Sequence, residues 1–220
     1  AIQFCSERLR DDKEFALVAV SHDIRAIKYC SDKLKEDKEV AIAAVSQNGL
    51  VLDSYSLKLR DDKEVAIAAV SQIGLALEYC SPRLRDDKEV ALAAVNQDGY
   101  VLQNCSEKFR DDKEVVLTAI SQDGKAINYC SARLRDDKEV ALAAVSQDGR
   151  ALEFCSENIQ KLCKGKDPIK TLESVILHEQ LQKEIKPKEL DFAKALSAEC
   201  KQATLEQSNQ VAKPKARMKI

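Results

Sequence analysis

A 25-residue phrase is repeated six times without insertion, and this repetition constrains the fold more than any single residue does. Each copy contains the tripeptide Asp-Lys-Glu. A fixed period of this size is typical of solenoids, in which each unit is too small to bury its own apolar face and must stack on its neighbours. We therefore expect an extended binding scaffold. The repeated aspartates are Asp12, Asp37, Asp62, Asp87, Asp112 and Asp137.

The first half of each repeat predicts a buried helix. In the third copy, Asp61 stands three residues before Glu64, which is the spacing of a capping box, and an apolar run follows over residues 65–70. A run that is apolar on nearly all sides predicts a helix buried between its neighbours. Gly74 stands where a left-handed residue would end this helix, and Ile24 at the same place in the first copy predicts a different turn there.

The second half of each repeat predicts a shorter helix and a tight helical turn. In the third copy the short helix covers residues 75–80, and the pair Ser81-Pro82 then combines a favoured N-cap residue with a proline at the first helical position. Leu84 is expected to fix this turn to the core. The predicted fold is all-α, an α-solenoid of about six two-helix repeats.

Six of the eight cysteines share one position of the repeat, and this spacing argues against disulfides and metal clusters. Equivalent atoms of packed helices lie roughly 10 Å apart, whereas a disulfide needs Cα atoms within about 7 Å. We expect small buried thiols in a reducing compartment. Tyr55 fills the one gap in this column, and Cys163 and Cys200 lie outside it with their pairing left open. The column contains Cys5, Cys30, Cys80, Cys105, Cys130 and Cys155.

The repeat resembles a known family, the domain of unknown function 4116. The resemblance is carried by runs such as Leu84 to Gly99, which begins Leu-Arg-Asp-Asp-Lys-Glu-Val, and it covers residues 1 to about 156. It implies no activity. Members are found in bacteria that live inside amoebae, where such arrays look like parts of secreted effectors, and in unicellular eukaryotes and large viruses. The resemblance thus implies a cytoplasmic protein, with the host cytoplasm as its destination after secretion.

The period is lost after Ser156, and three parts of the chain are therefore expected. Residues 1–156 form the helical repeat array. Asp167-Pro168 predicts the start of one amphipathic helix and Pro187 the start of another, so residues 157–210 are expected to form a helical hairpin that caps the array. Residues 211–220 carry four basic side chains and are predicted to be a disordered basic tail.

Most catalytic and ligand-binding chemistries find no support in the sequence. A net charge of −2 lacks the basic footprint of nucleic-acid binding, and no apolar run approaches the 18 residues that indicate a membrane span. His22 and His178 have no neighbouring nucleophile, and we find no phosphate loop, dinucleotide fingerprint or metal-ligand spacing. We assign the repeated carboxylates to helix capping and to charge ladders between repeats. We therefore predict that this segment is not an enzyme and that it binds neither a cofactor nor a metal.

Function is therefore sought where the copies differ, and the residue after the glycine position varies most. Three successive copies carry large apolar residues there, and cations flank them on both sides. Contiguous exposed apolar patches usually mark contacts. The alternative is that these side chains cover the base of the next short helix and belong to the core. The candidate partner-binding residues are Leu50, Leu75 and Tyr100, flanked by Arg25, Lys125 and Arg150.

Two hypotheses follow for the function of this chain. The first is a non-enzymatic protein–protein interaction scaffold that serves as the recognition module of a secreted bacterial effector. The second is an accessory fragment of a larger enzyme whose catalytic domain lies upstream of residue 1. The partner protein and the oligomeric state are left open.

Overall fold

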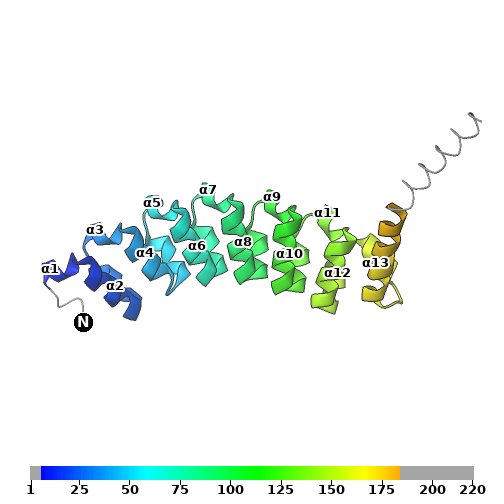
Figure 1. Ribbon diagram of the computed structural model, residues 1–220, viewed down its shortest axis with the longest axis horizontal. Coiled ribbons are helices and arrows are strands. Elements are labelled where there is room, and N and C mark those ends of the chain that lie inside the picture. The colour runs from blue at the N-terminus through cyan, green and yellow to red at the C-terminus, as the bar shows by residue number, and fades with distance from the viewer. Residues whose placement is uncertain (1–5, 184–220) are drawn as a thin grey trace, which may run out of the picture. The chain divides into compact units, whose positions relative to one another are not determined.

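The computed structural model describes residues 6–183, which fall into two compact units divided after Leu172. The part of the first unit that is described consists of helices joined by short turns, and no strand occurs among residues 6–183. Its long helices follow one another in chain order, each packed on the next (Figure 1). The all-α repeat solenoid predicted from the period is confirmed.

Every repeat contributes one long α-helix, one six-residue 3-10 helix and one four-residue α-helical turn. The long helices are α2 (Lys13–His22), α4 (Lys38–Val45), α6 (Lys63–Gln72), α8 (Lys88–Gln97), α10 (Lys113–Gln122) and α12 (Lys138–Gln147). The 3-10 helices are η2 (Ile24–Tyr29), η3 (Gly49–Ser54), η4 (Gly74–Tyr79), η5 (Gly99–Asn104), η6 (Gly124–Tyr129) and η7 (Gly149–Phe154). The short turns are α1 (Glu7–Arg10), α3 (Asp32–Lys35), α5 (Leu57–Arg60), α7 (Pro82–Arg85), α9 (Glu107–Arg110) and α11 (Ala132–Arg135).

The prediction that Asp61 caps the long helix of the third repeat is wrong, because the N-cap lies one residue later. The N-cap of α6 is Asp62, whose carboxylate accepts hydrogen bonds from the backbone N–H groups of Glu64 and Val65 at 3.0 and 3.2 Å. Asp61 instead ends α5 and binds the following repeat. The cap falls on the second aspartate because its backbone is extended, with φ −85° and ψ 122°, as an N-cap residue requires.

The glycines have a different role from the one predicted. Among the described residues, only Gly165 has a positive φ, so Gly74 is no left-handed helix end. It is the first residue of η4, and a Cβ built on it would lie 2.7 Å from the carbonyl oxygen of Ala94 in the next repeat. Glycine is needed here because two backbones approach closely. Ile24 begins η2 just as glycine begins the other 3-10 helices, so the secondary structure of the first turn does not differ.

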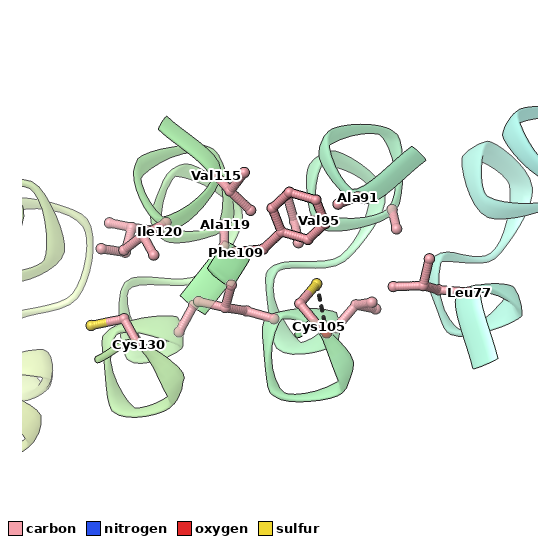
Figure 2. Packing of buried hydrophobic residues seen from close by; sticks show 14 of the residues in the cluster. Leu77, Ala91, Val95, Cys105, Phe109, Val115, Ala119, Ile120 and Cys130 are labelled. Atoms are coloured by element: carbon pink, nitrogen blue, oxygen red, sulfur yellow. Dashed lines mark hydrogen bonds between the residues drawn. The ribbon is translucent and has the colours of Figure 1, made fainter. Parts of the chain in front are cut away.

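The core runs between the long helices and the 3-10 helices. Phe109 of α9 lies between α8 and α10, beside Val95 and Ala119, and all three side chains are fully buried (Figure 2). Ala119 belongs to a column of alanines that lets neighbouring long helices approach closely. Leu84 is also buried and anchors its turn as expected.

The cysteine column is buried and unpaired, as the spacing predicted. Cys30, Cys80, Cys105, Cys130 and Cys155 are free thiols with exposed fractions of at most 6%. Cys163, which lies outside the column, is a buried free thiol as well. Cys5 and Cys200 lie outside the described residues.

The repeat period ends in a longer helix. The serine-capped turn of the last copy extends into α13 (Glu157–Cys163), and a further helix starts at residue 168 and continues to residue 183. Asp167 caps this helix by accepting a hydrogen bond from the Lys170 N–H, which confirms the predicted start. The second helix of the expected hairpin, from Pro187, and the basic tail over 211–220 lie outside the described residues.

Candidate functional site

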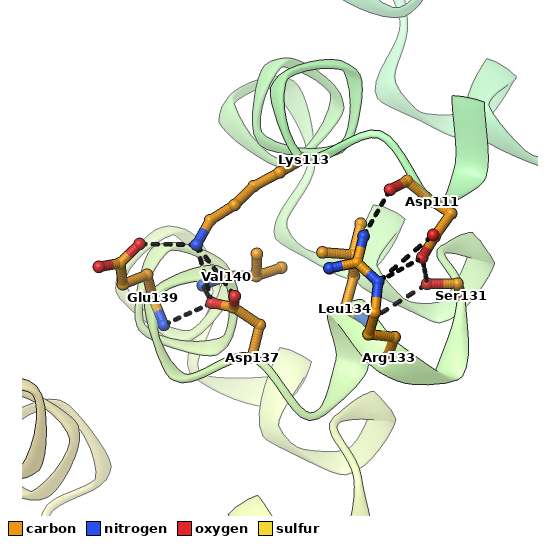
Figure 3. A network of polar contacts seen from close by, with 8 residues as sticks. All are labelled: Asp111, Lys113, Ser131, Arg133, Leu134, Asp137, Glu139 and Val140. Carbon is orange, nitrogen blue, oxygen red and sulfur yellow. Dashed lines mark hydrogen bonds and ion pairs between the residues drawn. The ribbon is translucent and has the colours of Figure 1, made fainter. Parts of the chain in front are cut away.

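The Asp-Lys-Glu tripeptides form a continuous ladder of ion pairs between repeats. Lys113 Nζ lies 2.9 Å from Asp137 Oδ2 and 2.6 Å from Glu139 Oε2 of the next copy (Figure 3). The same two contacts join Lys13, Lys38, Lys63 and Lys88 to the aspartate and glutamate 24 and 26 residues later. The assignment of these residues to capping and inter-repeat charge ladders is confirmed.

A second polar connection joins each short turn to the turn before it. Asp111, at the end of α9, accepts hydrogen bonds from the Ser131 hydroxyl and from Arg133 Nε, the latter at 3.0 Å (Figure 3). These bonds hold the pKa of the Asp111 carboxyl below its usual value. Asp61 is bound in the same way by Ser81 and Arg83. The repeated carboxylates are thereby engaged in holding neighbouring repeats together.

The candidate column occupies the second position of each 3-10 helix. The backbone N–H of Tyr100 donates a hydrogen bond to the Asp98 carboxylate at 2.9 Å, and the N–H of Leu50 donates to Asn48 at 3.0 Å. This side-chain cap fixes the backbone at the start of the 3-10 helix. At Leu75 the cap is absent because Ile73 takes the place of the Asp or Asn.

The apolar members of the column are partly exposed. The exposed fractions of Leu50, Leu75 and Tyr100 are 40%, 39% and 45%. Because η3 packs on η4 and η4 on η5, the three residues belong to successive stacked elements. These side chains are therefore not part of the fully buried core, and we refer to Leu50, Leu75 and Tyr100 as the apolar stripe.

The flanking cations are paired within the chain. Arg25 forms an ion pair with Asp23 at 3.0 Å, and Arg150 forms one with Asp148 at 3.1 Å. Lys125 reaches the same Asp148 of the next repeat at 3.7 Å. The guanidinium of Arg150 lowers the pKa of Asp148. The positive charge at both ends of the apolar stripe is thus partly neutralised before any partner binds.

Tyr129 supports the stripe and was missed by the sequence analysis. Its ring meets the ring of Tyr100 edge to face, with centroids 5.2 Å apart and planes at 83°. This contact restricts the Tyr100 side chain, so an exposed aromatic is held in place before binding. The signal was available in the sequence, since Tyr129 ends its 3-10 helix in a column that is aromatic in four of the six copies, the exceptions being Ser54 and Asn104.

The buried thiols have pKa values well above that of an ordinary cysteine. Burial raises the pKa of Cys80, Cys105 and Cys155 to about 11 and that of Cys130 to about 12. Such thiols are poor nucleophiles near neutral pH. Within residues 6–183, no group of three His, Cys, Asp or Glu side chains is placed to hold a metal ion. No helix in that range has the length and apolar character needed to cross a membrane.

The family predicted from the repeat is found by comparison with known proteins. Residues 1–29, 12–60, 62–110 and 112–160 match the family described as Domain of unknown function (DUF4116). The chain belongs to this family. Each full match spans two of the 25-residue copies. No curated protein and no solved structure matches the chain.

Proposed function

We propose that this DUF4116 array is a non-enzymatic scaffold for protein–protein interaction, with the apolar stripe as its partner-binding surface. The observation that carries the proposal is the exposure of three large apolar side chains at equivalent positions of three successively stacked 3-10 helices. A contiguous exposed apolar patch flanked by charge is the usual composition of a binding surface.

Tyr100 is the proposed anchor of this surface. Aromatic residues are enriched among the few side chains that dominate binding energy. Tyr100 is 45% exposed and is already oriented by its edge contact with Tyr129. A side chain held in one conformation loses less entropy on binding. Leu50 and Leu75 extend the apolar contact along the stack.

The cations at both ends of the stripe favour a partner with acidic groups around an apolar centre. Arg25 and Arg150 keep 79% and 73% of their side-chain area exposed, although each has an intrachain carboxylate. Rim charges of this kind set association rate and specificity more than affinity. The finer proposal, a recognition module of a secreted bacterial effector acting in a host cytoplasm, is drawn from the family resemblance and gives the class of lysate in which to look for the partner.

The proposal is tested by capturing partners from a host-cell lysate with the array as bait. The double variant Tyr100→Ala with Leu75→Ala should keep the helical circular dichroism spectrum and lose the captured partner, since truncating an anchor costs about 2 kcal/mol or more of binding.

The matched control is Val18→Ala. Val18 is 59% exposed on α2, and the same position of the repeat holds alanine at residues 68, 93 and 143. This variant also removes exposed apolar area but should capture the partner normally. Equal loss of capture by both variants would argue against the apolar stripe as the binding surface.

A further inference from the structure

A cleft of about 640 Å³ opens between the first and second repeats. Its apolar wall contains Ile24, Ile27, Val51 and Tyr55, and its polar rim includes Lys28 and Glu36. A volume of this size is within the range of pockets that bind small molecules. The cleft lies among residues of η2, η3 and α3, and the apolar stripe shares none of its lining.

The cleft exists because Ile24 replaces the glycine of the other repeats. A Cβ on Gly49 would collide with the carbonyl oxygen of Ala69, and a Cβ on Gly124 would lie 2.7 Å from that of Ala144. Because isoleucine carries a Cβ, η2 cannot approach the following long helix as closely. Accordingly, η3, η4, η5 and η6 each pack closely on the next long helix, whereas η2 does not pack closely on α4 or η3.

Tyr55 occupies this space at a position where the other repeats place cysteine. It packs against both of the core clusters into which the buried residues divide, one centred on the first two repeats and one on the rest. Its hydroxyl oxygen is buried and has no hydrogen-bond partner within the described residues. A buried unpaired hydroxyl costs free energy unless a ligand satisfies it. Burial raises the pKa of Tyr55 to about 12, so the phenol stays protonated and can donate.

The charged residues at the rim include one cation that makes no ion pair among residues 6–183, Lys28. Arg25, Lys28 and Lys35 line the cleft against a single carboxylate, that of Glu36, which accepts a hydrogen bond from the Ser56 hydroxyl at 2.6 Å. Arg25 and Lys35 are paired with Asp23 and Asp32. Lys28 is exposed and has no ion-pair partner within residues 6–183. An anionic group at the mouth of the cleft would meet this lysine.

We propose that the cleft binds a small amphiphile with an apolar body and a carboxylate head. The apolar body lies against Ile24, Ile27 and Val51, one carboxylate oxygen accepts a hydrogen bond from the Tyr55 hydroxyl, and the other lies near Lys28. Two residues that break the repeat pattern, Ile24 and Tyr55, thereby line one site. This inference is independent of the protein-binding role proposed above.

The test is calorimetric titration of the full chain with decanoate as the probe. We expect saturable binding with one site per chain. Ile24→Gly restores the repeat pattern, lets η2 approach α4 and closes the cleft, so decanoate affinity should fall at least tenfold while the helical circular dichroism spectrum is kept. Tyr55→Phe removes only the hydroxyl and should weaken binding about fivefold.

Two lysine variants test the charge at the rim. Lys28→Gln should weaken decanoate binding about threefold, since the pair is exposed to solvent. Lys33→Gln, on the exposed side of α3 and outside the lining, should leave it unchanged. The proposal is overturned if the wild-type chain shows no saturable heat at millimolar decanoate. It is equally overturned if folded Ile24→Gly and Tyr55→Phe both bind decanoate like the wild type.

Discussion

Lys113 Nζ lies 2.9 Å from Oδ2 of Asp137, while Oδ1 of the same carboxylate accepts the backbone N–H of Glu139 at 2.9 Å. One side chain therefore caps its own helix and holds the preceding repeat. The ion pair alone contributes little because it is partly solvent-exposed. The combination links the formation of α12 to the presence of α10, and this coupling is repeated from Lys13 to Glu139.

The two roles of Asp137 can be separated by substitution. Asp137→Ala removes both the cap and the ion pair and should lower the free energy of unfolding by about 1–2 kcal/mol. Asp137→Asn keeps an oxygen for the backbone N–H groups of Glu139 and Val140, so the loss should stay below about 1 kcal/mol. Urea unfolding followed by circular dichroism measures both. Asp53→Ala, on the exposed side of η3, is the control. If Asp137→Asn were as unstable as Asp137→Ala, the effect would come from the lost charge and not from the lost cap.

Glycine at the start of the 3-10 helices is expected to be essential only where another repeat follows. Gly124→Ala places a Cβ 2.7 Å from the Ala144 carbonyl oxygen and should cost about 1–3 kcal/mol. Gly149→Ala meets nothing within 4 Å and requires no positive φ, so it should be neutral or stabilise by up to about 1 kcal/mol. Thermal melting of the two variants compares them directly. Equal losses would show that the glycines are needed for backbone conformation after all.

The buried cysteines should resist labelling in the folded protein. With the pKa of Cys80 and Cys105 raised to about 11, alkylation at pH 8 should be slower by about two orders of magnitude or more than in urea. Cys163 should be protected as well, because only 2% of it is exposed. Peptide mapping by mass spectrometry after timed alkylation reports each site. Rapid native labelling of Cys80 would contradict its placement in the core.

Stability should fall on both sides of a plateau from about pH 5 to about pH 8. Hydrogen bonding from Lys63 lowers the pKa of Asp87, although burial opposes this shift. The contribution of Asp87 to the free energy of unfolding is therefore complete above the unfolded pKa of about 3.9, and it is lost as the pH falls through the lower pKa of the folded state. The buried thiols have raised pKa values, so their contribution is complete below about pH 8.5 and declines above it.

Melting temperatures between pH 2.5 and pH 10 test this profile. Asp87→Asn should flatten the acidic limb because it removes one of the carboxylates that must be protonated. A wild-type melting temperature unchanged down to pH 2.5 would show that the capping carboxylates contribute nothing.

The fold was predictable to the extent that one repeat determines it. The period, the buried apolar run and the Ser81-Pro82 turn gave the solenoid, and the shared cysteine position gave unpaired buried thiols. The prediction failed at Asp61 and at Gly74. Two adjacent aspartates have the same local propensity to cap, and only the contact between Asp61 and Ser81 of the next repeat distinguishes them. A glycine in a turn suggests a left-handed residue, while its closeness to Ala94 is a tertiary fact.

The candidate sites could be predicted only from residues that depart from the repeat pattern. The apolar stripe could be proposed because Leu50, Leu75 and Tyr100 differ from the cations in the same column. The cleft could not be proposed, although Ile24 and Tyr55 were visible as exceptions. These two residues are 31 positions apart in the sequence, and only the tertiary structure places residues of η2, η3 and α3 around one cavity that both residues line.

After the second repeat, the polar contacts between neighbouring repeats are made by equivalent residues, and this bears on how such genes change length. Lys38 meets Asp62 in the way that Lys113 meets Asp137, and Asp61 binds Ser81 in the way that Asp111 binds Ser131. Removing residues 62–111 would therefore join Lys38 to Asp112 and Asp61 to Ser131 without an unmatched surface. Unequal recombination between copies can lengthen or shorten the array in whole units, and selection then acts on the few residues by which the copies differ.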